Sequence, residues 1–174
     1  MIMPIIPIMP IIPIMFTSYA SPVGTLYLYA QGDYIIRLDF AQSPAVARWF
    51  VKYFTNLEIK EGSSPVLERL RAELDAYFAG RRRAFTVPIK LHGTAFQMKV
   101  WQALREIPYG QTVSYGALAA RLGAPGASRA VGGANHNNPV AIVVPCHRVV
   151  GADGSLVGFG GGLDCKAFLL ALEK

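Results

Sequence analysis

The chain has 174 residues, of which 52% are hydrophobic and 16% are charged, with a net charge of +6. This composition excludes a chain too polar to bury a core, and the length suits one domain or two small ones. The positive charge permits nucleic acid, anionic membranes or acidic partners without choosing among them. The only cysteines, Cys146 and Cys165, are too few for a disulfide framework, so we expect a reducing, cytoplasmic compartment. Because no His/Cys cluster has metal-ligand spacing, we also predict no metal site.

Residues 1–15 (MIMPIIPIMPIIPIM) carry a proline at every third position, with Ile and Met between. Proline at this period enforces an extended polyproline II path, which excludes a membrane-spanning helix of about 20 apolar residues. The stretch also has no basic start or cleavage site of a signal peptide. Two interpretations stay open. The stretch is either a hydrophobic tail that docks on this or another molecule, or a start-site artefact in which Met15 is the true first residue. We favour the second, and assign residues 1–14 to a disordered or artefactual tail.

Residues 15–90 have the pattern of a first domain. Aromatic and β-branched residues predict strands over 25–30 and 34–40, joined by a hairpin turn. Apolar residues then recur at helical spacing over 46–54 and over 66–78, and the second helix has Ser64 as its expected N-cap. Nothing in this part of the chain has a catalytic pattern, and we place a domain boundary near residues 88–92.

Three further helices are predicted after that boundary, over residues 94–107, 114–122 and 127–134. The last two are short and joined by a tight turn with Gly126. This arrangement is typical of a helix-turn-helix, although any small αα-hairpin has the same pattern.

The third of these helices combines small residues with a single large cation, Arg129. Gly132 and Gly133 each cost roughly 1 kcal/mol relative to alanine inside a helix, which indicates that another backbone comes very close. Few of its side chains, Ser128 and Arg129 among them, can read base edges. The helix therefore fits close approach to DNA with little sequence readout.

The stretch from 142 to 151 (IVVPCHRVVG) places a thiol between two β-branched runs. Since proline belongs at the edge or end of a strand, we expect Pro145 to hold Cys146 at the mouth of a strand. His147 and Arg148 both favour the thiolate, which is the reactive form of cysteine. The alternative is an inert, half-buried cysteine with a surface His-Arg pair. A short turn over 135–139 joins this stretch to the predicted DNA-facing helix, which favours chemistry on a base.

A glycine-rich loop over 156–162 precedes a closing helix over 164–173. The loop lacks the GxxxxGK[ST] pattern of a phosphate cradle. With Phe159 as its one aromatic residue, it fits a flexible wall on which a base stacks.

These motifs together resemble the O6-alkylguanine-DNA alkyltransferases, closely over residues 92–174 and more loosely over residues 16–90. The segments that carry the resemblance are Pro145–Val149, Asn138–Pro139, Ser128–Ala134, Gly160–Leu163 and Leu169–Glu173. The resemblance implies an α+β protein, with a ribonuclease H-like α/β domain over 15–90 and a winged helix-turn-helix domain over 91–174. It also implies stoichiometric repair of O6-alkylguanine in double-stranded DNA, without a cofactor and by a monomer. Activity on O4-alkylthymine stays open.

The resemblance further implies catalytic roles. Cys146 accepts the alkyl group, His147 acts as its base through a water molecule, and Glu173 orients His147. Asn138 braces the turn between the DNA-facing helix and the thiol. Tyr115 contacts a phosphate and protonates the departing guanine. A base that acts on a nucleophile and is itself held by a carboxylate follows the logic of catalytic triads.

Other residues are implied in DNA and substrate binding. Arg129 fills the space of the flipped nucleotide, on a DNA-facing surface that includes Ser128, Ala130, Gly132 and Gly133. The carbonyl groups of Cys146 and Val149 hold the amino group of the guanine, while Phe159 and Gly160 line the pocket. Some relatives carry serine at the position of Gly160, so only a backbone N–H is left here to contact O6.

Two other classes of protein share part of this pattern. A lesion-binding protein without transfer activity has the same helix-turn-helix and arginine but lacks the acceptor cysteine. A winged-helix transcription regulator needs more base-reading side chains than this helix offers.

Overall fold

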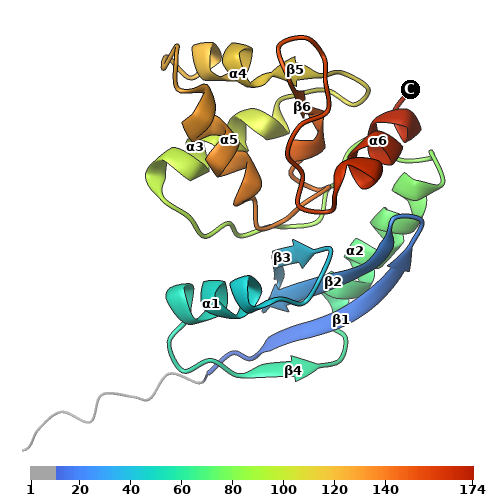
Figure 1. Ribbon diagram of the computed structural model, residues 1–174. Coiled ribbons are helices and arrows are strands. Elements are labelled where there is room, and N and C mark those ends of the chain that lie inside the picture. Colours follow the sequence, from blue (N-terminus) through green and yellow to red (C-terminus); the bar gives the residue numbers. More distant parts are fainter. Residues whose placement is uncertain (1–10) are drawn as a thin grey trace, which may run out of the picture.

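The computed structural model of the chain describes residues 11–174, which form two parts stacked one above the other in Figure 1. The lower part holds a sheet and two helices, and the upper part holds most of the remaining helices. No helix in the described range is long and apolar enough to cross a membrane.

The lower part is built on a four-stranded sheet in the order β3-β2-β1-β4. Strands β1 (Ile14–Ser21), β2 (Gly24–Gln31) and β3 (Tyr34–Asp39) are antiparallel neighbours, as the aromatic and β-branched pattern predicts for the second and third. The short β4 (Ile59–Glu61) pairs in parallel with β1 at the sheet edge. All three residues of β4 are exposed, so it has no hydrophobic alternation from which to predict it.

Helices α1 (Pro44–Tyr53) and α2 (Pro65–Phe78) cover opposite faces of this sheet. Alternate side chains of a strand point to opposite faces. Accordingly, Tyr29 of β2 packs on Phe50 of α1, with ring centroids 5.0 Å apart, whereas Leu28 belongs to the cluster that contains α2. Both helices begin at a serine N-cap followed by proline, as favoured for a helix start.

The upper part begins with α3 (Ala95–Arg105), which has the predicted capping box between Thr94 and Gln97. Helices α4 (Tyr115–Arg121) and α5 (Ser128–His136) form the helix-turn-helix, and α5 continues two residues beyond the prediction. Strands β5 (Val113–Ser114) and β6 (Val149–Val150) pair in parallel beside it. The last helix, α6 (Leu163–Leu172), packs against the 3₁₀ turn η1 (Cys146–Arg148).

The predicted strand end at Cys146 was wrong, because the thiol lies on the η1 turn. Backbone groups in this stretch bond locally: Val144 N–H donates to the carbonyl of Val140 at 2.9 Å, and Cys146 N–H to that of Val144 at 2.8 Å. Ile142 adopts a φ of 71°, which is unusual for a β-branched residue and marks backbone strain beside the thiol. The β-branched residues around Cys146 therefore reflect the burial of this stretch and not a strand that ends at the thiol.

The two parts share one hydrophobic core, which runs from α2 through α3 to α6. Their backbones also meet directly, since Leu38 N–H of β3 donates to the Pro139 carbonyl at 2.8 Å. The turn that leads to Cys146 is thus attached to the sheet of the first domain.

Strand β1 begins at Ile14, so the proposed tail of residues 1–14 reaches one residue into the folded domain. Ile14 is 1% exposed and pairs with Ile59 of β4, whereas Ile12 is 57% exposed. Residues 1–10, which contain most of the proposed tail, lie outside the described residues. We therefore propose that the dispensable segment ends before Ile14.

Replacing Ile14 by alanine is expected to lower the free energy of unfolding by about 2 kcal/mol or more, because it empties a packed position. Ile12→Ala is the matched control and should change it by less than about 0.5 kcal/mol. Urea unfolding followed by circular dichroism measures both. Equal, small effects would contradict the assignment of Ile14 to the core.

Candidate active site

The thiol of Cys146 lies at the start of the η1 turn and is only 5% exposed. Asn138, which follows α5, holds the approach to this turn from both sides. Its Nδ2 donates to the Val144 carbonyl at 2.8 Å, and its Oδ1 accepts from Val140 N–H at 3.1 Å. Asn138 therefore links the segment that follows α5 to the residues directly before the thiol.

The residue after the thiol, His147, is fully buried and bonded to Glu173, with 2.8 Å between Nε2 and Oε1. Arg148 binds the same carboxylate through Nε and Nη2, each at 2.9 Å, and donates through Nη1 to the Ile107 carbonyl at 2.6 Å. The sequence did not reveal this use of Arg148, since an arginine beside a cysteine is as readily read as a surface residue.

Glu173 is ionised in this network. Burial by itself favours the neutral acid, but hydrogen bonds from His147 and Arg148 outweigh it and hold the pKa of Glu173 well below its ordinary value. Burial lowers the pKa of His147 and the Glu173 hydrogen bond opposes that shift, so the imidazole is neutral at physiological pH.

The hydrogen bond to a carboxylate fixes the tautomer of His147. Nε2 carries the proton that faces Glu173, which leaves Nδ1 as an acceptor. Nδ1 has no hydrogen-bond partner among residues 11–174. No direct hydrogen bond joins it to Cys146 there, so a proton could pass between the thiol and His147 only through an intervening group.

The surroundings of Cys146 have opposing effects on the pKa of its thiol. Burial raises the pKa of Cys146, while a hydrogen bond with the Asn138 side chain and the charge of Lys166 oppose the rise. Lys166 is itself buried on α6, where Nζ donates to the carbonyls of Val149 at 2.6 Å and Val157 at 2.8 Å. Sequence reasoning missed Lys166, although a lone lysine on the inner side of an apolar helix is a detectable signal.

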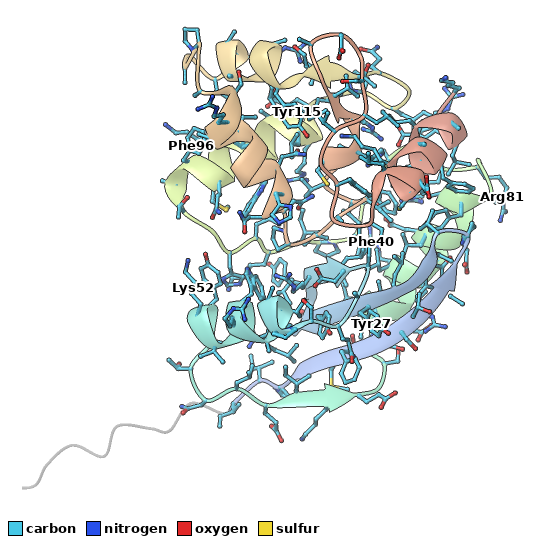
Figure 2. All side chains as sticks on the ribbon, viewed as in Figure 1. Tyr27, Phe40, Lys52, Arg81, Phe96 and Tyr115 are labelled. Atoms are coloured by element: carbon cyan, nitrogen blue, oxygen red, sulfur yellow. The ribbon has the colours of Figure 1, made fainter. Side chains whose placement is uncertain are left out.

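A cavity of about 400 Å³ opens beside Cys146, between the two parts of the molecule. Phe159 and Gly160 of the glycine-rich loop line it, as expected, together with Asn135 and Phe40. Phe40 comes from the end of β3 and meets Phe159 edge-on, with centroids 5.3 Å apart. Figure 2 shows Phe40 at the boundary between the two parts, so the first domain helps to position the loop.

Two carbonyl groups that the resemblance assigns to the guanine already accept hydrogen bonds. Asn135 Nδ2 donates to the Cys146 carbonyl at 3.3 Å, and Lys166 donates to that of Val149. Val149 itself is fully buried and lies outside the residues that line the cavity. The Cys146 carbonyl also accepts from the backbone N–H of Val149, so both of its lone pairs are already engaged.

Four of the predicted DNA-facing residues line a second, shallow hollow of about 360 Å³. The lining residues include Tyr115 (labelled in Figure 2), Ser128, Arg129 and Gly132. The hydroxyl of Tyr115 donates to the Val157 carbonyl at 3.3 Å. Arg129 is exposed on α5.

Three small residues of α5, Ala130, Gly132 and Gly133, are not required by close packing within the described chain. A Cβ added to Gly132 would meet the Tyr115 ring at 3.8 Å, an ordinary contact, and one added to Gly133 would meet nothing within 4 Å. Ala130 is likewise exposed. The helix surface is therefore open to an outside partner.

Residues 11–174 contain no group of three or more His, Cys, Asp or Glu side chains that would hold a metal ion.

A helix-turn-helix with an open small-residue surface, joined through Asn138 to a buried thiol, defines a DNA-binding protein with a cysteine site. Comparison with known families narrows this class. Residues 14–91 match the family model described as the ribonuclease-like domain of 6-O-methylguanine DNA methyltransferase, and residues 95–174 match its DNA-binding domain. The chain belongs to the 6-O-methylguanine DNA methyltransferase family. The predicted family and the predicted α+β, two-domain fold are confirmed.

Curated relatives and solved structures agree with this assignment. A methylated-DNA–protein-cysteine methyltransferase of Haemophilus influenzae is 44% identical, over 91% of this chain and 86% of the relative. The one from Mycobacterium leprae is 48% identical over 90% of each chain. The crystal structure of the Mycobacterium tuberculosis O6-methylguanine methyltransferase is 42% identical, covers 92% of each chain and has a TM-score of 0.79. A complex of the Mycobacterium tuberculosis protein with DNA has the same TM-score and 43% identity, over 91% of this chain and 92% of the other.

Replacing Glu173 by glutamine is expected to lower the free energy of unfolding at pH 7 by about 3 kcal/mol or more, because Arg148 is left buried without its counter-charge. Glu106→Gln, at an exposed helix end, is the control and should cost less than about 0.5 kcal/mol. Denaturant unfolding measures both.

The Glu173→Gln variant also tests the charge state of Glu173, by comparison with the wild-type protein. Folding lowers the pKa of Glu173 from its ordinary value of 4.5. The ionised carboxylate therefore stabilises the folded chain fully above pH 4.5, and this stabilisation is lost as the pH falls below that value. The wild-type protein should therefore lose more stability on acidification than the Glu173→Gln variant. Parallel acid profiles would contradict an ionised, stabilising Glu173.

Proposed function

We propose that this protein repairs O6-alkylguanine in double-stranded DNA by transferring the alkyl group to its own Cys146. The observation that carries the proposal is the thiol itself, buried at a cavity and attached by Asn138 to the end of the DNA-facing helix. Family membership supports the same reaction, since the relatives are methylated-DNA–protein-cysteine methyltransferases.

The damaged base lies inside a stacked duplex, so its nucleotide must be flipped out before it reaches the thiol. Flipping costs a few kcal/mol, and least for a damaged pair. Arg129 enters the duplex and occupies the space of the base, while Ser128, Ala130, Gly132 and Gly133 let α5 approach the DNA closely. The exposure of Arg129 and the open surface of α5 support this step.

In the chemical step the thiol proton passes through water to Nδ1 of His147, and the sulfur attacks the alkyl carbon. An S–C bond forms, the bond between that carbon and O6 breaks, and guanine leaves with the electron pair. Tyr115 gives a proton to the departing guanine. Glu173 stabilises the imidazolium that forms, which is the role of the carboxylate in a triad.

The pocket holds the base during this reaction. Phe159 offers an aromatic wall, Gly160 a backbone N–H, and the carbonyl groups of Cys146 and Val149 accept from the amino group of the guanine. The thioether that results is stable, so each molecule reacts once. One chain contains the whole set of residues, which supports a monomer. Its two cysteines are free and buried, which supports a reducing compartment such as the cytoplasm.

Cys146→Ala tests the acceptor. The variant is expected to bind an O6-methylguanine duplex but to gain no methyl group, whereas the wild-type protein gains one on Cys146. Intact-mass and peptide mass spectrometry after incubation measure the transfer. Methylation of the variant would mean another acceptor, and binding without transfer by the wild-type protein would identify a lesion binder instead.

Arg129→Ala tests the flipping step. The rate of repair in a duplex is expected to fall at least about tenfold, the equivalent of about 1.4 kcal/mol of lost flipping energy, because nothing replaces the base in the stack. The rate with the free base O6-benzylguanine should stay nearly constant, since no stack has to be opened. Arg105→Ala, at the exposed end of α3, serves as the control. Equal losses with both substrates would deny Arg129 this role.

A further inference from the structure

The first domain places one side chain inside the acid–base network of the second. Tyr77 lies on α2, is fully buried, and donates its hydroxyl hydrogen bond to Glu173 Oε1 at 2.8 Å. The same hydroxyl lies 3.5 Å from Nε2 of His147. Nothing in the sequence distinguished Tyr77 from its neighbours, because it continues the apolar side of an amphipathic helix.

The hydroxyl keeps its proton at this position and donates it to Glu173. Burial, and then the charge of Glu173, raise the pKa of Tyr77 far above its ordinary value, so the phenol stays protonated. Its ring is held among Phe78, Phe85 and Tyr109, with centroid distances from 5.3 to 6.3 Å. A rigidly packed ring with a fixed proton can therefore direct the carboxylate oxygen that it meets.

That oxygen is the one that holds the catalytic imidazole. Oε1 of Glu173 accepts from Tyr77, from Nε2 of His147 and from Nη2 of Arg148, while Oε2 accepts from Arg148 Nε and from Gly110 N–H. Of these donors, Tyr77 alone comes from the first domain. Its place on Oε1 fixes where Nε2 of His147 points, and through the ring it fixes where Nδ1 points.

We propose that Tyr77 is a positioning residue for alkyl transfer, through which the first domain orients His147 by way of Glu173. This inference rests on the proposed function and adds a residue to it. It gives the first domain a part in activating the thiol, besides its contact with the glycine-rich loop through Phe40.

Removal of the hydroxyl has a predictable electrostatic effect. The charged and titratable groups that face His147 are Glu173, Arg148, Lys166 and Tyr77. Without the Tyr77 donor, Oε1 keeps more negative charge toward the imidazole, which raises the pKa of His147. Because His147 must be neutral to accept the thiol proton, the acidic side of the rate profile then moves to higher pH.

The experiment compares the wild-type chain with Tyr77→Phe in single-turnover transfer from excess O6-methylguanine duplex, across pH from about 5 to about 9. We expect the rate constant of the variant at neutral pH to fall about fivefold, which is the effect of one hydrogen bond of about 1 kcal/mol. We also expect the acidic limb to move up by about half a pH unit. Replacement by p-aminophenylalanine keeps a donor at the end of the ring and should restore both.

Tyr109→Phe is the matched control, because its hydroxyl donates at 3.0 Å to the Leu172 carbonyl and not to Glu173. It should leave the pH profile unchanged. Since each molecule reacts once, the amplitude of the reaction counts folded protein, and the rate constant reports the chemistry separately. A loss of stability alone would lower the amplitude of Tyr77→Phe and leave its rate constant intact.

Two results would overturn the inference. Transfer by the wild-type protein together with an unchanged rate constant and pH profile for Tyr77→Phe would make Tyr77 a packing residue only. A wild-type protein that places no methyl group on Cys146 would contradict the proposed function, and the role of Tyr77 with it.

Discussion

The carboxylate of Glu173 is the interaction on which the rest of the site depends. It is buried with five hydrogen bonds, from Tyr77, His147, Gly110 N–H and two nitrogens of Arg148. A buried charge is tolerated only when it is paired and fully hydrogen-bonded, so each of these donors has to be in place. The carboxylate thereby ties α2, the loop after α3, the η1 turn and the C-terminus of α6 into one arrangement, and the position of the thiol follows from it.

The surroundings of Cys146 are consistent with a nucleophile used once and on one substrate. Burial raises its pKa, so the free protein holds mostly the unreactive thiol. In the proposed reaction the thiol proton passes to His147, whose neutral form follows from its burial and whose proton-free Nδ1 follows from the hydrogen bond of Nε2 to Glu173. A thiol that stays protonated until a substrate fills the cavity is protected from alkylation and oxidation by other compounds. This protection suits a protein that is consumed by its own reaction.

Both domains contribute to this cavity, although only the second carries the reactive residue. Phe40 of the sheet packs on Phe159, and a Cβ added to Gly161 would meet the Phe40 ring at 2.8 Å, so the glycine-rich loop takes its path around this ring. Asn138 transmits the position of α5 to the η1 turn. The glycine-rich loop is therefore positioned by a contact that crosses the domain boundary, whereas α5 and the thiol are joined within the second domain.

The sequence by itself determined the helix-turn-helix, the amphipathic helices, the predicted hairpin of the first domain and the residues around Cys146. These features depend on local periodicity, capping and motif spacing, which are written in neighbouring residues. Only the tertiary structure decided that Cys146 lies on a 3₁₀ turn, that Lys166 and Arg148 are buried cations, and that Tyr77 reaches Glu173. The last pair is separated by 96 positions. Such contacts arise from the packing of distant elements, and no local pattern in the chain records which buried side chains will meet.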